Sequence, residues 1–439
     1  MTTATGPTTR AVAVPAPLVR GAAGRRLGWW VAGALVLAVL PLVPGLDSNF
    51  SRSMLSQMAI ATVFALSFNV LLGQTGLLSF GHAVYFGLGG YVAIHAMRLI
   101  NGGMPIPMVL VPLIGGLGGL VFGLLIGLFT TKRAGTVFAM ITLGLGELVV
   151  AASLMLTRFF GGEEGITANR TRGPHVLGIK FASQLEVYYL AAFWTLVSIA
   201  LIYLFTRTPV GRMCNAVRDN PERAEFVGYN PQRVRFIAFA VAALFAGVAG
   251  GLHAVNYEIV AAEALGAARS GAVLLMTFIG GTGYFFGPIV GAIIITWLQV
   301  SLSDFTTAWQ LYFGVFFIII VMFAPGGLVG LVLMHTPLAR AGVLRRVVPT
   351  YVVAAVPALV MSLGASLLLE MAYRRATKPE LGNTMRVYWT DLDVSRPWPW
   401  LAGLALVVLG LVGFRWSTRL VAAGWRRATD ELTPPEAQP

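Results

Sequence analysis

Long apolar runs alternate with short polar joints along nearly the whole chain. Crossing the hydrocarbon core of a bilayer takes about 20 helical residues, and the runs reach that length. Strands of a membrane β-barrel would instead read as alternating segments of about ten residues, which this sequence does not show. The pattern therefore predicts an all-α polytopic membrane protein.

Counting these runs gives about 12 membrane passes. The expected spans are residues 28–44, 55–72, 77–97, 108–130, 137–156, 187–205 and 237–257, two passes within 271–300, and then 311–333, 347–369 and 400–414.

The stretch 271–300 is apolar but is interrupted by glycines and by Pro288. If it crossed once, the next span would end outside and would place Arg340, Arg345 and Arg346 there. Two passes put these arginines inside, where positive joints belong. We therefore expect a hairpin of two short or broken helices, because irregular backbone is tolerated at membrane depth where protein buries it.

The composition agrees with a membrane protein and limits other functions. Hydrophobic residues make up 57% of the chain and charged residues 11%, against about a quarter charged in soluble domains. The net charge of +13 lies in the joints between spans, which indicates cytoplasmic loops rather than nucleic-acid binding. Cys214 is the single cysteine, so no disulfide framework or thiolate metal site is expected.

The same reading divides the chain into segments. Residues 1–26 are rich in Ala, Thr, Pro and Arg and are expected to form a disordered cytoplasmic tail. Residues 27–333 form the main transmembrane domain, and 340–429 form a C-terminal extension with two further spans. A disordered tail at 430–439 follows, so both termini are expected in the cytoplasm.

Residues 207–236 form the longest strongly charged segment between two spans, with six arginines. Asn220 can cap a helix, Pro221 suits its first position, and Gly228 suits a left-handed stop. These signals predict a helix of about two turns over 221–227. Asn230-Pro231 repeats the start signal for the next helix.

Several polar or small residues lie inside the apolar runs and are candidates for a translocation path. The group is Gln74, Thr75, Ser79, His82, Glu147, Gly281, Thr282 and Gly283. Hydroxyl and amide groups beside glycines can line a path or can simply bond neighbouring helices. The glycine break at 281–283 can present a positive helix end to a carboxylate or can serve packing alone. Glu147 lies near the middle of its span, where an ionisable group is costly.

The charged loop also carries a motif. Glu222-Arg223-Ala224, followed after three residues by Gly228, resembles the EAA-x3-G loop of ABC importer permeases. Together with the stretches 71–83, 216–224 and 280–292, it resembles the branched-chain amino acid ABC permease family, specifically its LivM-type subunit. The resemblance runs from about residue 51 to 333, and residues 340–439 depart from the family pattern.

The resemblance implies an ABC importer permease fold in the bacterial plasma membrane. It also implies an extracytoplasmic binding protein, a second permease subunit (LivH-like, or this chain again), and ATPase subunits that dock on residues 207–236, called the coupling loop below. The residues expected to act in coupling are Arg218, Asn220, Pro221, Glu222, Arg223, Ala224 and Gly228, with Arg218 in an ion pair to the partner.

The sequence has no G-x-x-x-x-G-K-[ST] phosphate loop, so Mg-ATP is expected on a partner subunit and no cofactor on this chain. No catalytic constellation is present, and the chain is expected not to be an enzyme. Two alternatives remain: a permease for urea or short amides, which shares these motifs, and a proton-coupled carrier. The carrier would need carboxylates within the membrane, of which only Glu147 is found.

Overall fold

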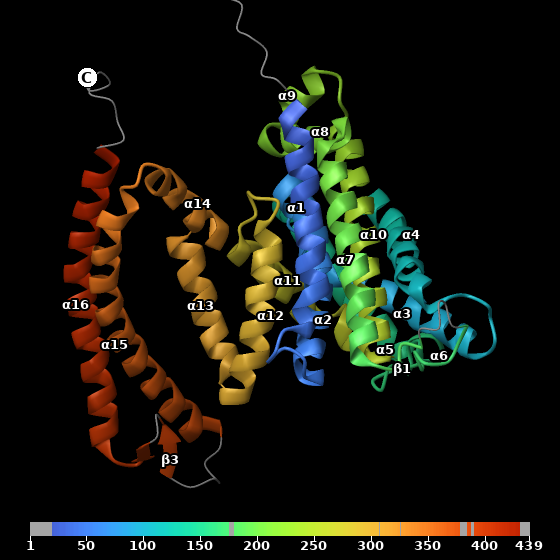
Figure 1. The fold of residues 1–439 in the computed structure, drawn as a ribbon. Coiled ribbons are helices and arrows are strands. Elements are labelled where there is room, and N and C mark those ends of the chain that lie inside the picture. The colour runs from blue at the N-terminus through green and yellow to red at the C-terminus, as the bar shows by residue number, and fades with distance from the viewer. Residues whose placement is uncertain are drawn as a thin grey trace, which may run out of the picture.

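The apolar runs fold into helices that lie roughly side by side, as the computed structural model shows (Figure 1). The structure describes residues 20–174, 180–306, 308–324, 326–377, 384–387 and 390–430. The larger helices are α1 (Arg20–Val39), α2 (Asn49–Thr75), α3 (Ala83–Asn101), α4 (Val111–Thr130), α5 (Gly135–Met155), α7 (Gln184–Arg207), α8 (Pro209–Asp219), α10 (Pro231–Tyr257), α11 (Ala267–Gly280), α12 (Gly287–Phe305), α13 (Trp309–Phe323), α14 (Gly327–Arg340), α15 (Leu344–Thr377) and α16 (Pro397–Asp430).

Short elements connect these helices. They are η1 (Leu40–Leu42), η2 (Met108–Leu110), α6 (Thr157–Phe160), α9 (Pro221–Phe226), η3 (Ala262–Leu265) and four short strands. Strand β1 (Ile166–Thr167) pairs antiparallel with β2 (Ile259–Val260), and β3 (Thr384–Val387) pairs antiparallel with β4 (Thr390–Asp393). The strands lie at the opposite end of the molecule from α8 and α9 (Figure 1).

The protein is an all-α polytopic membrane protein. In the described residues, nine helices are long and apolar enough to cross a bilayer, and the pair α13–α14, bent by 43°, makes a tenth. The expected number of about 12 passes is higher because it includes two shorter apolar helices, Trp30–Leu42 and Ala267–Gly280. Each of these is below the length that crosses the membrane unaided.

Helix α10 lies at the centre of the main bundle and packs against α2, α3 and α4. Glycines make this crossing close: a side chain at Gly115 of α4 would come within 2.8 Å of the Gly247 carbonyl oxygen on α10. Gly89 of α3 also lies against Gly247. Small residues let helix backbones approach in this way, which is how membrane helices gain packing energy without a hydrophobic driving force.

The glycine-rich stretch forms a helical hairpin, as expected: α11 ends at Gly280 and α12 begins at Gly287. A side chain at Gly291 would collide with the carbonyl oxygen of Met276, and one at Gly280 with that of Gly287. The glycines are therefore required where the two arms cross.

Two of the differences from the expected boundaries have a local cause. The span expected at 77–97 starts as a helix only at Ala83, because Gly76 ends α2 in the left-handed conformation at φ +69° and the chain then runs without helix to His82. Helix α1 begins at Arg20, within the tail expected at 1–26, because its Ala- and Arg-rich sequence continues the apolar helix. Residues 1–19 and the tail at 431–439 lie outside the described residues.

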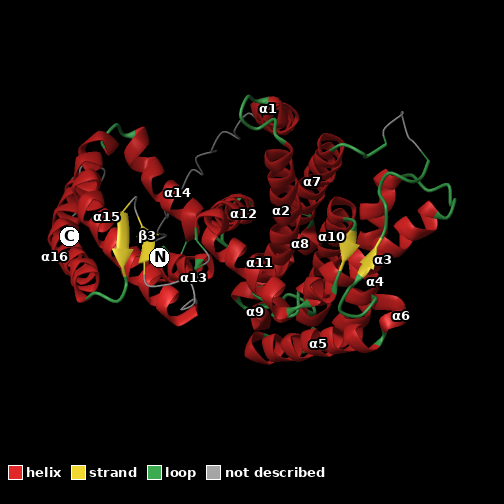
Figure 2. Cartoon of the chain, turned by 90° about the horizontal axis from the view of Figure 1, so that it is seen from below, coloured by secondary structure: helices red, strands yellow, loops and turns green. Residues whose placement is uncertain are grey.

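Helices α15 and α16 form a long antiparallel pair beside α13 and α14 (Figures 1 and 2). Close packing at Gly364 and Gly410 holds the two helices together. At one end, Glu370 Oε1 accepts hydrogen bonds from Thr306 Oγ1 at 2.6 Å and from Tyr312 Oη at 3.0 Å. These contacts attach the pair to the main bundle.

Candidate coupling and translocation site

The coupling loop folds into two short helices joined at a single residue. Thr208 caps α8 by accepting a hydrogen bond from the Gly211 amide at 3.1 Å, and Pro209 occupies the first position. Asn220 ends α8 and caps α9, because its Oδ1 accepts from the Arg223 amide at 2.9 Å. Helix α8 was not separated from the rest of the loop in the sequence, although Thr208-Pro209 carries the same start signal as Asn220-Pro221.

Helix α9 ends in a Schellman motif, the hydrogen-bonded left-handed stop of a helix. Gly228 has a φ of +92°, and its amide donates to the Glu225 carbonyl at 2.8 Å. The Tyr229 amide donates to the Ala224 carbonyl at 3.1 Å. Both ends of α9 are therefore fixed by hydrogen bonds that the sequence encodes locally.

The surface of α9 is mixed in character. Ala224 is buried against the rest of the protein, whereas Glu222 and Arg223 are exposed. Phe226 is 90% exposed and Val227 is 70% exposed. A rigid helix that presents a large apolar side chain beside charged ones has the character of a protein-docking surface.

Helix α8 connects the coupling loop to the end of α2. The Asn215 side-chain amide donates to Gln74 Oε1 at 3.1 Å, and Arg218 Nη1 donates to the Gly73 carbonyl oxygen. Arg218 Nε also bonds Asp219 Oδ1 at 3.0 Å. Gln74, expected on the path, is thus bonded to the coupling loop.

The connection continues to the turn between α11 and α12. A side chain at Gly73 would come within 2.6 Å of the Thr282 carbonyl oxygen, so the two backbones touch. Gly281 has a φ of +114° and lies against Gly326, just before α14. This geometry corresponds to the packing alternative for Gly281 and Thr282, while Gly283 is exposed and has open space around it.

The segment between α2 and α3 holds the remaining polar candidates. Thr75 Oγ1 donates to the Leu71 carbonyl at 2.5 Å, a bond within its own helix. His82 Nε2 bonds Ser67 Oγ at 2.9 Å, and its ring stacks on Phe64. Ser79 Oγ and His82 Nδ1 are buried without a partner in the described residues. Of this group, Ser79 and His82 therefore have polar atoms left for a ligand or water.

Helix α5 supports this segment and carries Glu147. The Phe80 amide donates to Thr142 Oγ1 at 3.2 Å, and Gly146 packs on Gly81. Glu147, next along the helix, is exposed. A mid-span carboxylate on an exposed face indicates that protein or water, rather than lipid, covers this face in the membrane.

Cys214 lies on the inner face of α8 and is completely buried. Burial raises the pKa of its thiol to about 12, because the thiolate would lose its hydration. The residue is therefore part of the packing and unsuited to redox or nucleophilic chemistry.

One functional candidate was missed from the sequence. Arg269, near the start of α11, lies over the Phe86 ring at 4.8 Å and bonds His253 Nδ1 at 3.2 Å through Nη2. Its Nε is buried without a hydrogen-bond partner in the described part of the chain. The signal was available in the sequence, since Arg269 is the single Lys or Arg between Arg235 and Arg340.

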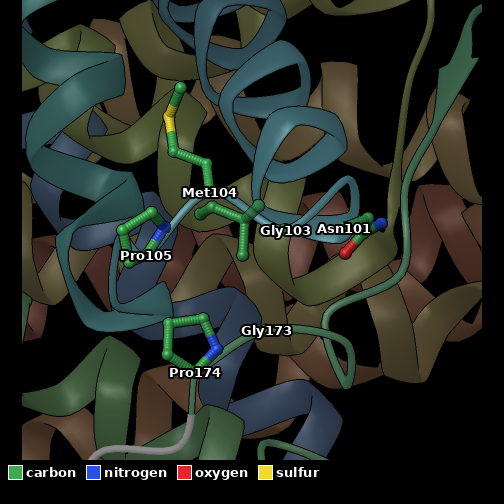
Figure 3. Close-up of a pocket in the computed structure, with 7 residues that line it drawn as sticks. Asn101, Gly103, Met104, Pro105, Gly173 and Pro174 are labelled. Carbon is green, nitrogen blue, oxygen red and sulfur yellow. The ribbon is translucent and has the colours of Figure 1, made fainter.

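A separate cavity of about 330 Å³ lies at the end of α3, and Figure 3 shows the residues around it. Helices α8 and α9 lie at the other end of the molecule from β1, which follows this region (Figure 1). Pro105 and Pro174 lie near each other at the cavity, the Met104 side chain extends away from Pro174, and Asn101 lies to one side (Figure 3). Its lining is Ile100, Asn101, Gly103, Met104, Pro105, Gly173 and Pro174, none of which was expected in a site. Elsewhere too, the described residues hold no cluster of three potential metal ligands.

Comparisons with known proteins assign the chain to a family. The family model described as branched-chain amino acid transport system, permease component, matches residues 51–335. The high-affinity branched-chain amino acid transport system permease protein LivM of Escherichia coli (strain K12) is 27% identical over 322 residues, which cover 68% of this chain and 74% of the relative.

Further relatives include a second LivM and a sugar permease. A probable LivM of Methanocaldococcus jannaschii is 24% identical over 61% of this chain and 89% of its own length. The galactose/methyl galactoside import permease protein MglC of Haemophilus influenzae is 27% identical over 58% of this chain and 79% of its own length. No solved structure matches the chain significantly.

The matched segment contains the coupling loop, the α2–α3 connection and the α11–α12 hairpin, and it stops before α15. The resemblance inferred from the sequence motifs is confirmed by the family model and by the LivM relatives. The chain therefore belongs to the family of permease components of branched-chain amino acid transport systems.

Proposed function

We propose that this chain is the permease subunit of an ABC importer that carries branched-chain or related amino acids across the bacterial plasma membrane. An extracytoplasmic binding protein delivers the amino acid. A second permease subunit, LivH-like or a second copy of this chain, completes the path. ATPase subunits that bind Mg-ATP dock on the coupling loop and drive transport.

The observation that carries the proposal is a continuous series of contacts that leads from α9 through α8 and the end of α2 to the turn between α11 and α12. Helix α9 is capped at both ends, so a partner that moves it moves a rigid body. Asn215 and Arg218 pass the displacement to the end of α2. Gly73 then passes it to Thr282 by direct backbone contact. ATPase closure can in this way reposition the helices around the buried Ser79 and His82.

The orientation follows from the same surface. We place α8 and α9 in the cytoplasm because the coupling loop carries six arginines. Helix α16 ends on the same side as α9, whereas α6 and β1 lie at the other end (Figure 1). The end of α16 is then cytoplasmic, and the cavity near Met104 faces the binding protein.

Uptake by the assembled importer tests the function. The chain is co-expressed with its ATPase, second permease and binding protein in a strain without leucine uptake. We expect leucine uptake that requires an active ATPase and that persists with an uncoupler while ATP is maintained. Uptake that collapses with the uncoupler would indicate a proton-coupled carrier. If urea, short amides or galactose compete and isoleucine does not, the transported substrate is not a branched-chain amino acid. Galactose is included because the MglC relative is a galactose import permease.

A further inference from the structure

Helix α11 is short and begins beside the start of α3. It has 14 residues, about 21 Å of helix, which is too short to cross the membrane. Ser270 Oγ, in its first turn, accepts a hydrogen bond from the Ala83 amide at the start of α3. Leu265, just before α11, lies against Gly87 of α3. After β2 the chain therefore runs along α3 to its start, and α11 begins there.

The N-terminus of α11 has no capping side chain. Gly266 is the capping residue and makes no side-chain hydrogen bond. Ala267 and Ala268 are exposed, so this end is reachable from the surface of the chain. The first amides of a helix carry a partial positive charge, which favours an anion at this position.

Arg269 adds a full positive charge at the same place. Its contacts with Phe86 and His253 leave the buried Nε without a partner among the described residues. Glu263 on η3 interacts with the guanidinium electrostatically, yet no carboxylate forms a salt bridge with Arg269 in the part of the chain that the structure describes. A largely buried cation without a paired acid is costly, and within a membrane it marks a functional position.

We infer that Arg269 and the free amides at the start of α11 bind the α-carboxylate of the transported amino acid. The inference rests on the proposed function for the identity of the substrate. A guanidinium bonds a carboxylate through two parallel N–H groups, and Nε is one of the donors that remain free. The amides of Ala267 and Ala268, which precede the first backbone bonds of α11, supply further donors. This site differs from the glycine break before α12, whose backbone is occupied by packing.

Substitution of Arg269 in the complete importer tests the site. Arg269→Gln removes the charge and shortens the side chain, and we expect leucine uptake to fall about tenfold or more, since the charge-assisted bonds to the carboxylate are lost. Arg269→Lys is expected to keep a larger fraction. The matched control is Arg98→Gln at the exposed end of α3, where Arg98 bonds the Thr167 carbonyl at 2.9 Å. It should retain uptake within about twofold. Equal uptake by Arg269→Gln at an equal membrane level would overturn the inference.

A labelling experiment keeps the test open if Arg269→Gln does not fold. Ala268→Cys places a thiol at the exposed start of α11, and the native Cys214 is buried. We expect an anionic methanethiosulfonate to react about tenfold faster than a cationic one, because the site is positive. Leucine should slow the reaction, and leucinamide, which lacks the carboxylate, should not.

The outcomes separate this inference from the proposed function. A cationic reagent that reacts as fast as the anionic one, or equal protection by leucine and leucinamide, would overturn the carboxylate site even in an importer that transports leucine. If the wild-type importer takes up no leucine, the proposed function fails, and the reagent preference still decides whether the site attracts anions.

Discussion

At the scale of single residues, two polar contacts hold the coupling loop to the end of α2. Asn215 donates to Gln74 Oε1, and Arg218 donates to the Gly73 carbonyl oxygen. From the sequence, Gln74 was expected on the translocation path and Arg218 in an ion pair to the ATPase. Contacts between residues more than 140 positions apart depend on how helices pack, which no local pattern encodes. The assignment of Arg218 to a partner stays a prediction.

Arg218→Ala should uncouple the coupling loop from α2. The substitution removes the bond to the Gly73 carbonyl and the packing of the Arg218 stem on Gly76. A hydrogen bond from a charged donor is worth about 1.5–3 kcal/mol, so we expect leucine uptake per ATP hydrolysed to fall about tenfold. Reconstituted importer in vesicles gives both rates. Arg212→Ala, which removes an exposed arginine from the same helix, should leave the ratio unchanged. An unchanged ratio in Arg218→Ala would remove this residue from the connection.

The buried thiol of Cys214 gives a second prediction at this scale. With the pKa raised to about 12, only about one thiol in ten thousand is ionised at pH 8. A maleimide should therefore leave the folded chain unmodified and should label it after denaturation in detergent, as read by mass. In the Arg223→Cys variant the new thiol is exposed and should react in the folded state, from the cytoplasmic side only. Rapid labelling of the wild-type chain would contradict the burial of Cys214.

At the scale of elements, local signals were the most reliable part of the sequence. Helix α9 begins and ends as expected, at Asn220-Pro221 and before Gly228. These ends could be predicted because capping and a left-handed stop depend on neighbouring residues alone. The helical hairpin around 280–287 was predicted from the glycines and from the need to keep the arginines after residue 333 on the cytoplasmic side. The start of α3 was missed because the apolar residues 77–78 continue the pattern without forming helix.

The caps of α9 should matter for transport because they make the helix rigid. Asn220→Ala removes a cap worth about 1 kcal/mol, and Gly228→Ala forces a side chain into the left-handed region at about 1–2 kcal/mol. We expect each to lower leucine uptake several-fold at a normal membrane level. Pro221→Ala is the control, since Ala also suits the first helical position, and Asn220→Asp should preserve the cap. Full uptake by both destabilised variants would indicate that the partner imposes the helix on binding.

At the scale of the whole molecule, the chain consists of a main bundle and a separate pair of helices, α15 and α16, that the family model does not cover. The family match ends at residue 335, and α15 and α16 pack mainly on each other. Their polar contacts with the rest include Glu370 at one end and, at the other, His335 Nε2 bonded to Tyr351 Oη at 2.8 Å. All these partners lie on α13, α14 or the joint before α13, and none of them belongs to the coupling loop.

Removing residues 342–439 should therefore spare transport and lower stability. The truncated chain loses the bonds of Glu370 and Tyr351, each worth about 1 kcal/mol, and it exposes Leu338, which packs on Val347 and Ala428. We expect leucine uptake within about threefold of wild type, and a melting temperature in detergent lower by several degrees. Glu370→Gln in the full chain, which keeps an acceptor, should shift the melting temperature less than Glu370→Leu. If the truncated chain reaches the membrane at the wild-type level and transports nothing, then the pair takes part in the transport cycle, and its contacts with α13 and α14 are the route by which it does so.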